Sequence, residues 1–244
     1  MSSLAIEQSI DQKFAPQSKR GQGESEAFLS VLKERRTYYQ ISKNAAIPDS
    51  RVEEIVKYAI KHVPSSFNGQ TTRALILFNE DHDEFWNSTA HVRDMLPAEQ
   101  MEKTQQKLDS FKAGHGTILF FDDEAVIRQQ QEAFKLYADN FPIWANQSNG
   151  MAQYVVWTAL EKEGFGASLQ VCAVNPDDVF GCRLTKSATK HYNPLVDSVV
   201  QTKWKVPVTW KLLAQMPFGV PTGEPGPKDY RSLEERVMVA GKKD

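Results

Sequence analysis

The sequence predicts a layered fold of the α+β or α/β class, on the basis of three observations. Helical patterns outnumber strand patterns along the chain. Two short apolar runs, residues 74–78 and 116–121, have the length of buried strands and are separated by long helical stretches. Residues 150–162 are apolar on nearly every side, which is typical of a helix at the centre of a fold or at a subunit contact. Helices that cover a sheet give a layered architecture.

Length and composition indicate one globular domain with an extra segment. The chain has 244 residues, 41% hydrophobic and 25% charged, which is enough to bury a substantial core. Residues 1–23 are polar and contain Pro16, Gly21 and Gly23, so we expect a flexible arm before a domain at residues 24–244. A net charge of −2 and the absence of a long apolar run predict neither nucleic acid nor membrane as a partner.

The N-terminus and the cysteines favour a cytoplasmic location, with the nucleus as the alternative. The first residues include Glu7 and Asp11 and no sustained apolar run, which argues against a secretory signal or a mitochondrial presequence. Cys172 and Cys182 fit neither a zinc site nor a C-x-x-C redox motif. A reducing compartment is therefore the default interpretation.

The first two helices follow from apolar periodicity. Residues 25–36 have one apolar face, and residues 50–63 have a single buried stripe. Ser50 and Glu53 match the S-x-x-E capping box, which predicts that the second helix begins at Ser50. Pro64 cannot continue this helix. The positions of its stripe are Val52, Ile55, Val56, Ala59, Ile60 and Val63.

The remainder of the chain alternates helices with short strands. The predicted helices are residues 81–96, 98–111, 124–137 and 150–162. The predicted strands are residues 74–78, 116–121, 167–169 and 211–218. Prolines and glycines between residues 221 and 227 predict a segment without regular structure until about Tyr230.

Three loops are candidates for binding a ligand, and each has a plainer alternative. Residues 34–37 carry two arginines that suit a phosphate, but arginines also complement the carboxyl end of their own helix. Residues 65–70 offer short polar groups for a flat polar ring, or are ordinary turn residues. Residues 164–170 would let a planar ring lie close to the backbone, or are a glycine-terminated helix followed by a strand.

No motif supplies catalytic chemistry from side chains alone. The sequence has no dinucleotide fingerprint, P-loop, nucleophile elbow or H-E-x-x-H motif. Its five histidines lack metal-ligand spacing, and we interpret each as a surface or hydrogen-bonded histidine. The chain has several polar and glycine-containing loops but no catalytic triad or set of metal ligands. This combination predicts that a bound cofactor supplies the chemistry.

Five short motifs follow one another along the chain. They are R-R-T-Y-Y at residues 35–39, P-S-S-F-N-G-Q at 64–70, W-T-A-L-E at 157–161, G-A-S-L-Q at 166–170 and F-G-V-P at 218–221. In this order they resemble the nitroreductase family of FMN-dependent oxidoreductases, in a branch shared by fungi and bacteria. The resemblance extends from about Glu26 to Tyr230.

The resemblance implies an α+β sandwich, in which helices flank a central mixed, mainly antiparallel sheet. It also implies a domain-swapped-type homodimer that binds two FMN molecules at its interface, with no catalytic side chain and no metal. The implied cofactor-binding residues are Arg35, Arg36, Thr37 and Lys228 for the phosphate and ribityl chain, Ser65, Ser66, Asn68 and Gln70 of the second subunit for the isoalloxazine ring, and Gly166, Ala167, Ser168 and Leu169 for the region near N5.

The same resemblance implies an FMN-dependent NAD(P)H oxidoreductase. It would use NADH or NADPH to reduce nitroaromatic, quinone or related small-molecule acceptors in a ping-pong cycle. One alternative is a flavin-dependent protein of redox or lipid-stress signalling, for which nitroreduction is incidental. Another alternative is a flavin-binding dimer without enzymatic activity.

Residues 171–190 interrupt the pattern, because the family branch continues directly from G-A-S-L-Q to H-Y-N-P-L. The segment could be a substrate-gating loop or a tolerated surface insertion. We favour a third hypothesis, a translated intron, because valine codons begin with GT, a lysine codon can end with AG, and Arg-Leu-Thr can encode a branch-point-like string. If the segment is translated, we expect a disordered excursion that impairs FMN binding.

Overall fold

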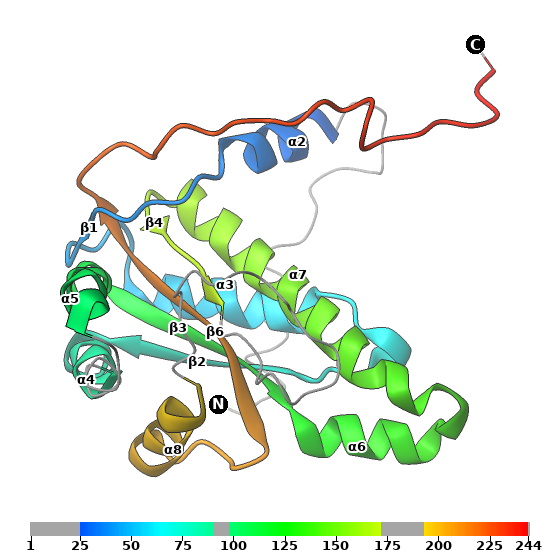
Figure 1. The fold of residues 1–244 in the computed structure, drawn as a ribbon, viewed down its shortest axis with the longest axis horizontal. Helices are drawn as coiled ribbons and strands as arrows, with labels where there is room; N and C mark the ends of the chain where they lie inside the picture. Colours follow the sequence, from blue (N-terminus) through cyan, green and yellow to red (C-terminus); the bar gives the residue numbers. More distant parts are fainter. Residues whose placement is uncertain (1–24, 90–97, 172–192, 244) are drawn as a thin grey trace.

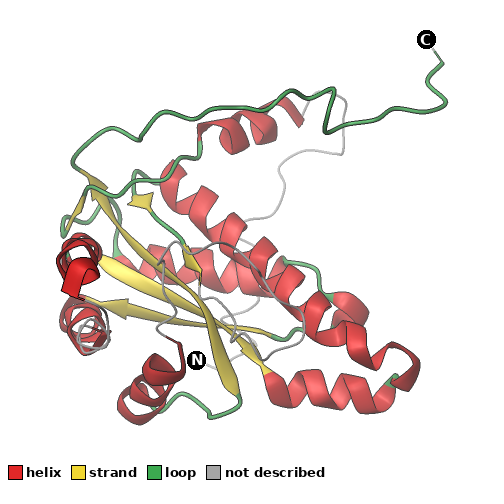
Figure 2. Ribbon diagram, in the orientation of Figure 1, coloured by secondary structure: helices red, strands yellow, loops and turns green. Residues whose placement is uncertain are grey.

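The computed structural model describes residues 25–89, 98–171 and 193–243, which form a sheet with helices on both faces (Figures 1 and 2). This confirms the α+β class. The interpretation of residues 1–23 as an arm lies outside the described residues. So does that of residues 171–190 as an insertion, except for Val171, which pairs with Ala214 in the sheet. The elements in chain order are α2 (Ser25–Glu34), β1 (Ile41–Ser42), α3 (Asp49–His62), a 3₁₀ turn (Ser66–Asn68), β2 (Thr72–Phe78), α4 (Asn79–Thr89), α5 (Ala98–Lys112), β3 (Gly116–Asp123), α6 (Glu124–Ala133), a 3₁₀ helix (Lys135–Asn140), α7 (Phe141–Lys162), β4 (Gly166–Ala167), β5 (Gln170–Val171), α8 (Asn193–Trp204) and β6 (Trp210–Pro221).

The sheet is organised around β6, its longest described strand. The main strand order is β1-β6-β3-β2, and β4 and β5 also pair with β6. Every described pairing is antiparallel. All eight residues of β3 are buried, which explains why this strand is a continuous apolar run and does not alternate.

Two hydrophobic cores bury the two faces of the sheet. On one face, α3 and α7 pack against the strands through residues such as Val56, Val156 and Leu160. On the other face, α4, α5 and α8 pack through residues such as Trp86 and Val200. The three layers can be followed in Figure 1, where α7 crosses the sheet diagonally.

The buried His82 confirms the interpretation of this histidine as structural. Its Nδ1 lies 2.8 Å from Thr117 Oγ1, and its Nε2 lies 3.1 Å from the Lys112 carbonyl oxygen. Burial lowers the pKa of His82 to about 4. The ring is therefore neutral at physiological pH and joins α4 to β3 and α5.

Several predicted boundaries were wrong, for local reasons. The capping box does not form: Pro48 is the N-cap of α3, no side chain caps the helix, and Ser50 lies inside the first turn. The helix predicted at residues 124–137 ends at Ala133 and continues as the 3₁₀ helix. The apolar helix begins at Phe141, nine residues before its predicted start. The strand predicted at residues 167–169 is replaced by the two short strands β4 and β5, and α8 and β1 were not predicted.

Asp122 predicts a pH dependence of stability. Burial raises the pKa of its carboxyl group to about 6, although a hydrogen bond of 2.9 Å from Asn149 Nδ2 and the Arg73 charge act in the opposite direction. Because the folded state holds this proton more tightly than the unfolded chain, the stabilisation is present below about pH 4 and is lost as pH rises through 6. Between these limits the free energy of unfolding of the wild type should fall by on the order of 2 kcal/mol, and that of Asp122→Asn should lack this decrease.

Denaturant unfolding of both proteins at pH 5 and pH 8 measures this effect. The exposed Asp139→Asn serves as the control, since its carboxylate lies on the surface. Equal pH dependence in the wild type and in Asp122→Asn would contradict the assignment.

Candidate active site

The arginine motif and the G-A-S-L-Q motif meet at the carboxyl end of α7. The backbone N–H of Tyr38 donates to the Ala167 carbonyl oxygen at 3.0 Å. A side chain at Gly166 would place its Cβ 2.7 Å from Tyr38 Cβ, so this close approach requires glycine. The structure therefore brings the turn that carries Arg35, Arg36 and Thr37 close to β4.

Arg35 has two buried donor nitrogens without acceptors at this position. Its guanidinium carbon lies 4.2 Å from the centre of the Trp157 ring, in a cation–π contact. Its Nε and Nη1 are buried and find no acceptor among the described residues, and the same is true of Trp157 Nε1. Buried donors almost always have acceptors, so these three nitrogens would suit an anionic or carbonyl-bearing ligand.

Glu161, at the end of the W-T-A-L-E motif, fixes the arginine turn. Both of its carboxylate oxygens accept from the Arg36 backbone N–H at 2.8 Å. Burial raises the pKa of Glu161, while this hydrogen bond and the charges of Arg35 and Arg36 act in the opposite direction. The sequence contained Glu161 within a motif, but only the structure indicates its role as the acceptor that orients the turn.

The C-terminal tail reaches the same place. Arg36 Nη2 donates to the carbonyl oxygen of Gly226, and Figure 1 shows the tail running beside α2. Lys228 follows two residues later, with its exposed ammonium 5.3 Å from the Tyr230 ring. Lys228 is thus close in sequence to a contact with Arg36, and its role in binding a phosphate stays a prediction.

The G-A-S-L-Q segment presents backbone more than side chains. Ser168 is 1% exposed, and its hydroxyl accepts from Gln170 Nε2 at 3.2 Å. Its N–H donates to the Pro217 carbonyl oxygen at 3.2 Å, and Leu169 packs against the core of α3 and α7. The Ser168 hydroxyl is therefore used inside the protein.

The second half of the predicted site, the loop at residues 65–70, has a strained backbone. Phe67, Asn68 and Gln70 have φ angles of 53°, 51° and 48°, in the left-handed region that disfavours side chains. Ser65 Oγ accepts from the Gln70 N–H at 2.9 Å and closes the loop. The side chains of Asn68 and Gln70 are exposed, and backbone strain of this kind is typical of functional sites.

The loop packs against α6 and the beginning of α7 through an aromatic cluster. The ring of Phe67 lies 4.5 Å from that of Phe134, 5.6 Å from Phe141 and 6.1 Å from Trp144, between centroids. Gln130 Nε2 of α6 also donates to the Ser66 carbonyl oxygen. The loop is therefore fixed at the amino end of α7.

Within one chain the two halves of the site are far apart. The arginine turn contacts α7 at Trp157 and Glu161, whereas the loop contacts it at Phe141 and Trp144. Thirteen positions separate Trp144 from Trp157, which is about 20 Å along a helix. Figure 1 shows α2 and α6 at opposite ends of α7. Within one chain, the two predicted half-sites therefore lie toward opposite ends of α7.

The sequence matches the Nitroreductase family over residues 32–219. The chain belongs to this family. It is 30% identical over 207 residues to nitroreductase FRM2 of Saccharomyces cerevisiae, which covers 83% of this chain and 92% of FRM2. It is 37% identical to nitroreductase CinD from Lactococcus lactis, and the matches cover 87% of this chain and 99% of CinD. The TM-scores are 0.72 to the CinD complex with chloramphenicol and 0.69 to the complex with nicotinic acid.

Membership of the nitroreductase family confirms the resemblance and assigns the chain to the oxidoreductases. No cluster of three or more side chains that could hold a metal occurs among residues 25–89, 98–171 and 193–243. In that part of the chain, no helix has the length and hydrophobicity needed to cross a bilayer.

Arg35 gives a test of this site that needs no ligand. Because its buried donors lack acceptors, Arg35→Met should leave the ligand-free protein as stable as the wild type or about 1 kcal/mol more stable. Arg51→Met is the matched control, since Arg51 Nε and Nη2 donate to Glu163 Oε1 at 2.9 and 2.7 Å, and this variant should lose stability. Chemical denaturation of the ligand-free proteins measures both, and similar losses would contradict the interpretation of Arg35.

Proposed function

We propose that this nitroreductase-family protein is an FMN-dependent NAD(P)H oxidoreductase. It reduces nitroaromatic, quinone or related acceptors by hydride transfer in a ping-pong cycle. The observation that carries the proposal is the set of buried donors of Arg35 and Trp157, which lack acceptors beside the glycine-containing strand β4. A phosphate or a ribityl oxygen of FMN is an acceptor of the kind these donors require.

The residues that would hold FMN come from both halves of the site. Arg35, Arg36, Thr37 and Lys228 would bind its phosphate and ribityl chain through charge-assisted hydrogen bonds. Backbone groups of residues 166–169 would lie near the reactive edge of the ring. Bound FMN supplies the capacity to accept and donate a hydride, and the protein supplies position and electrostatics. The ring-contacting residues of the second subunit are Ser65, Ser66, Asn68 and Gln70.

A homodimer is part of the proposal, because the surface of α7 suits a helix–helix contact. Ile143, Met151, Tyr154 and Val155 are exposed by 42%, 42%, 39% and 41%, an unusual apolar stripe for a surface helix. Gly150 lies on the same stripe, and a Cβ there would meet no atom within 4 Å. The stripe has the composition of a subunit interface, and its glycine permits close approach of a second helix.

Antiparallel pairing of two α7 helices would complete the site. If the helices cross near Gly150, Trp157 lies seven positions after the crossing and Trp144 lies six positions before it. Trp157 of one subunit would then lie opposite Trp144 of the partner subunit. This pairing places Arg35 of one subunit near the loop at residues 65–70 of the second.

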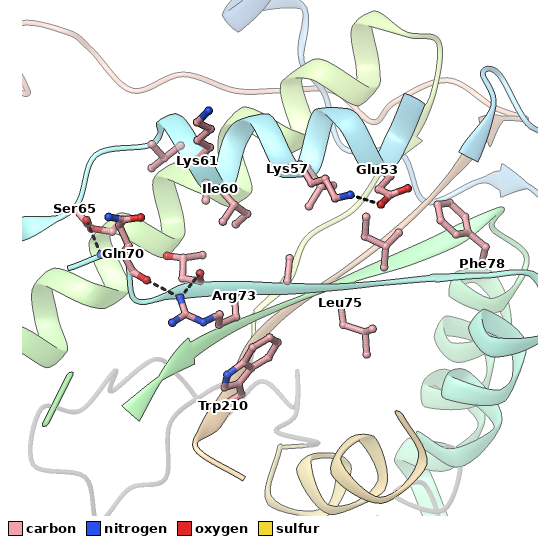
Figure 3. A pocket seen from close by; sticks show the side chains of 17 residues that line it. Glu53, Lys57, Ile60, Lys61, Ser65, Gln70, Arg73, Leu75, Phe78 and Trp210 are labelled. Atoms are coloured by element: carbon pink, nitrogen blue, oxygen red, sulfur yellow. Dashed lines mark hydrogen bonds and ion pairs between the residues drawn. The ribbon is translucent and has the colours of Figure 1, made fainter. Parts of the chain in front are cut away.

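The outer edge of β2 supports an exchange of C-terminal segments between subunits. No described strand pairs with this edge, and a groove of about 890 Å³ lies between β2 and α3 (Figure 3). Val56, Ile60 and Ala74 contribute to its apolar lining, and Lys57 and Lys61 also line it. A bare strand edge beside an apolar groove is a suitable position for an added strand.

The tail has the properties of such a strand. Residues 222–243 contain no helix or strand, and Leu233, Val237 and Val239 are exposed by 65%, 60% and 72%. We therefore propose that residues 233–240 of each subunit lie along β2 of the partner.

The acceptor class is proposed from chemistry that the relatives share. The solved complexes of CinD contain chloramphenicol, a nitroaromatic compound, and nicotinic acid, a pyridine ring like that of the nicotinamide donor. The aromatic cluster around Phe67 lies beside the loop that would contact the flavin. It supports the proposal that flat aromatic acceptors bind in this protein.

The absorbance spectrum of the purified protein tests the proposed function. We expect a yellow dimer with one FMN per subunit, whose flavin absorbance is bleached by NADH or NADPH without oxygen and restored by a nitroaromatic compound or a quinone. A colourless protein that takes up no added FMN would contradict the cofactor. A yellow protein that NADH and NADPH leave oxidised would contradict the enzymatic role.

A further inference from the structure

We propose that Arg73 is the positioning residue that holds the loop at residues 65–70 in its ligand-binding conformation. This inference rests on the proposed function, because the loop is the half-site that would contact FMN in the second subunit. Arg73 itself acts through the backbone of Gln70. It is therefore a positioning residue and not a catalytic one.

The Gln130 hydrogen bond and the aromatic cluster attach the Ser66–Phe67 part of the loop to α6 and α7, but the strained backbone also needs a support at its Gln70 end. Three of its residues, Phe67, Asn68 and Gln70, are left-handed and are not glycine. Each such residue costs on the order of 1 kcal/mol, and the conformation persists only where the surroundings fix it. The hydrogen bonds from Asn68 N–H to Ser65 O and from Gln70 N–H to Ser65 Oγ lie within the loop. They close the loop but do not connect it to the sheet.

Arg73 makes that connection with three hydrogen bonds. Its Nη1 donates to the Gln70 carbonyl oxygen at 2.6 Å and to the Thr72 carbonyl oxygen at 3.1 Å. Its Nη2 donates to Asp123 Oδ2 at 3.2 Å, and the guanidinium carbon lies 5.8 Å from the centre of the Trp210 ring. Figure 3 shows the side chain turned back from β2 toward Gln70, above Trp210. The guanidinium thus joins the last loop residue to β3.

Asp123 is a rigid anchor for this arginine. It is buried, its Oδ1 accepts from the Ala125 N–H at 3.1 Å as the N-cap of α6, and its own N–H donates to the Thr71 carbonyl oxygen at 2.9 Å. The carboxylate therefore has a fixed position at the junction of β3 and α6. Arg73 connects Gln70 to this fixed carboxylate. The hydrogen bond from Gln70 N–H to Ser65 Oγ then connects Gln70 to the beginning of the loop.

The geometry requires an arginine in particular. One guanidinium reaches two carbonyl oxygens with one nitrogen and a carboxylate with another, in a planar fork. A lysine ammonium could keep the ion pair with Asp123 but is a single point of attachment. A methionine keeps the volume and removes every donor. Arg73→Lys and Arg73→Met therefore separate the effect of charge from that of the fork.

Amide hydrogen exchange of the flavin-free protein, together with FMN affinity, tests the inference. In Arg73→Met we expect exchange at residues 66–71 to accelerate about tenfold, with β3 unchanged, and FMN to bind about tenfold more weakly. Arg73→Lys should lie between Arg73→Met and the wild type in both measurements. Arg128→Met is the matched control: Arg128 is an exposed arginine of α6, paired with Glu124, and should change neither.

The outcomes separate this inference from the proposed function. Unchanged exchange at residues 66–71 in Arg73→Met overturns the positioning role, and so does accelerated exchange with unchanged FMN affinity. Acceleration that extends over the whole sheet indicates a general loss of stability and also overturns it. If wild-type protein binds no FMN, the proposed function fails, and confined acceleration would still establish that Arg73 holds the loop.

Discussion

The length and the two-sided apolar surface of α7 constrain the rest of this molecule. One side of the helix packs into the core through residues such as Ala152, Val156 and Leu160. The opposite side carries Met151, Tyr154 and Val155 to the surface. Because hydrophobic burial is the main source of stability, a helix with two apolar sides favours a second partner beyond its own sheet. The arginine turn lies at one end of α7 and the polar loop at the other, so in the proposed dimer the partner that covers the helix would also complete the site.

The two half-sites differ in charge. The arginine half concentrates positive charge and unsatisfied donors around Arg35 and Trp157, with the Glu161 carboxylate holding the backbone beneath them. The loop half offers neutral groups, such as the amides of Asn68 and Gln70, on a backbone held in a strained conformation. A ligand with an anionic end and a flat polar ring matches this division. FMN has both features, which is why the proposal assigns the phosphate to one half and the ring to the other.

Much of the fold could be predicted from the sequence, because the spacing of apolar residues indicates which positions are buried. The stripe of α3 and the runs of β2 and β3 were recognised, since one buried face or complete burial leaves a clear pattern. The start of α3 was misplaced because Pro48 occupies the N-cap and Asp49 bonds to His115 Nε2. The remote His115 leaves no local signal. The helix α8 was not predicted because its apolar residues have no strong helical period, and β1 is too short to show any period.

The site was less predictable than the fold. The motifs predicted residues for two half-sites, but only the structure showed that the arginine turn is bonded to β4 and lies about 20 Å from the loop along α7. Sequence spacing does not report which donors are left without acceptors, so the unsatisfied nitrogens of Arg35 could not be foreseen. The roles of Glu161 and Arg73 also depend on contacts between segments that are distant in the sequence.

The most direct measurement is the flavin content of a hybrid dimer that joins an Arg35→Met subunit to an Asn68→Ala subunit, isolated through two different affinity tags. Each parent dimer carries a defect in both of its sites. In the hybrid, one site combines both altered residues and the other combines the intact Arg35 with the intact Asn68. The account predicts that the hybrid binds one FMN per dimer with wild-type affinity while both parents bind weakly. A hybrid that binds no better than its parents would contradict a site shared between two subunits.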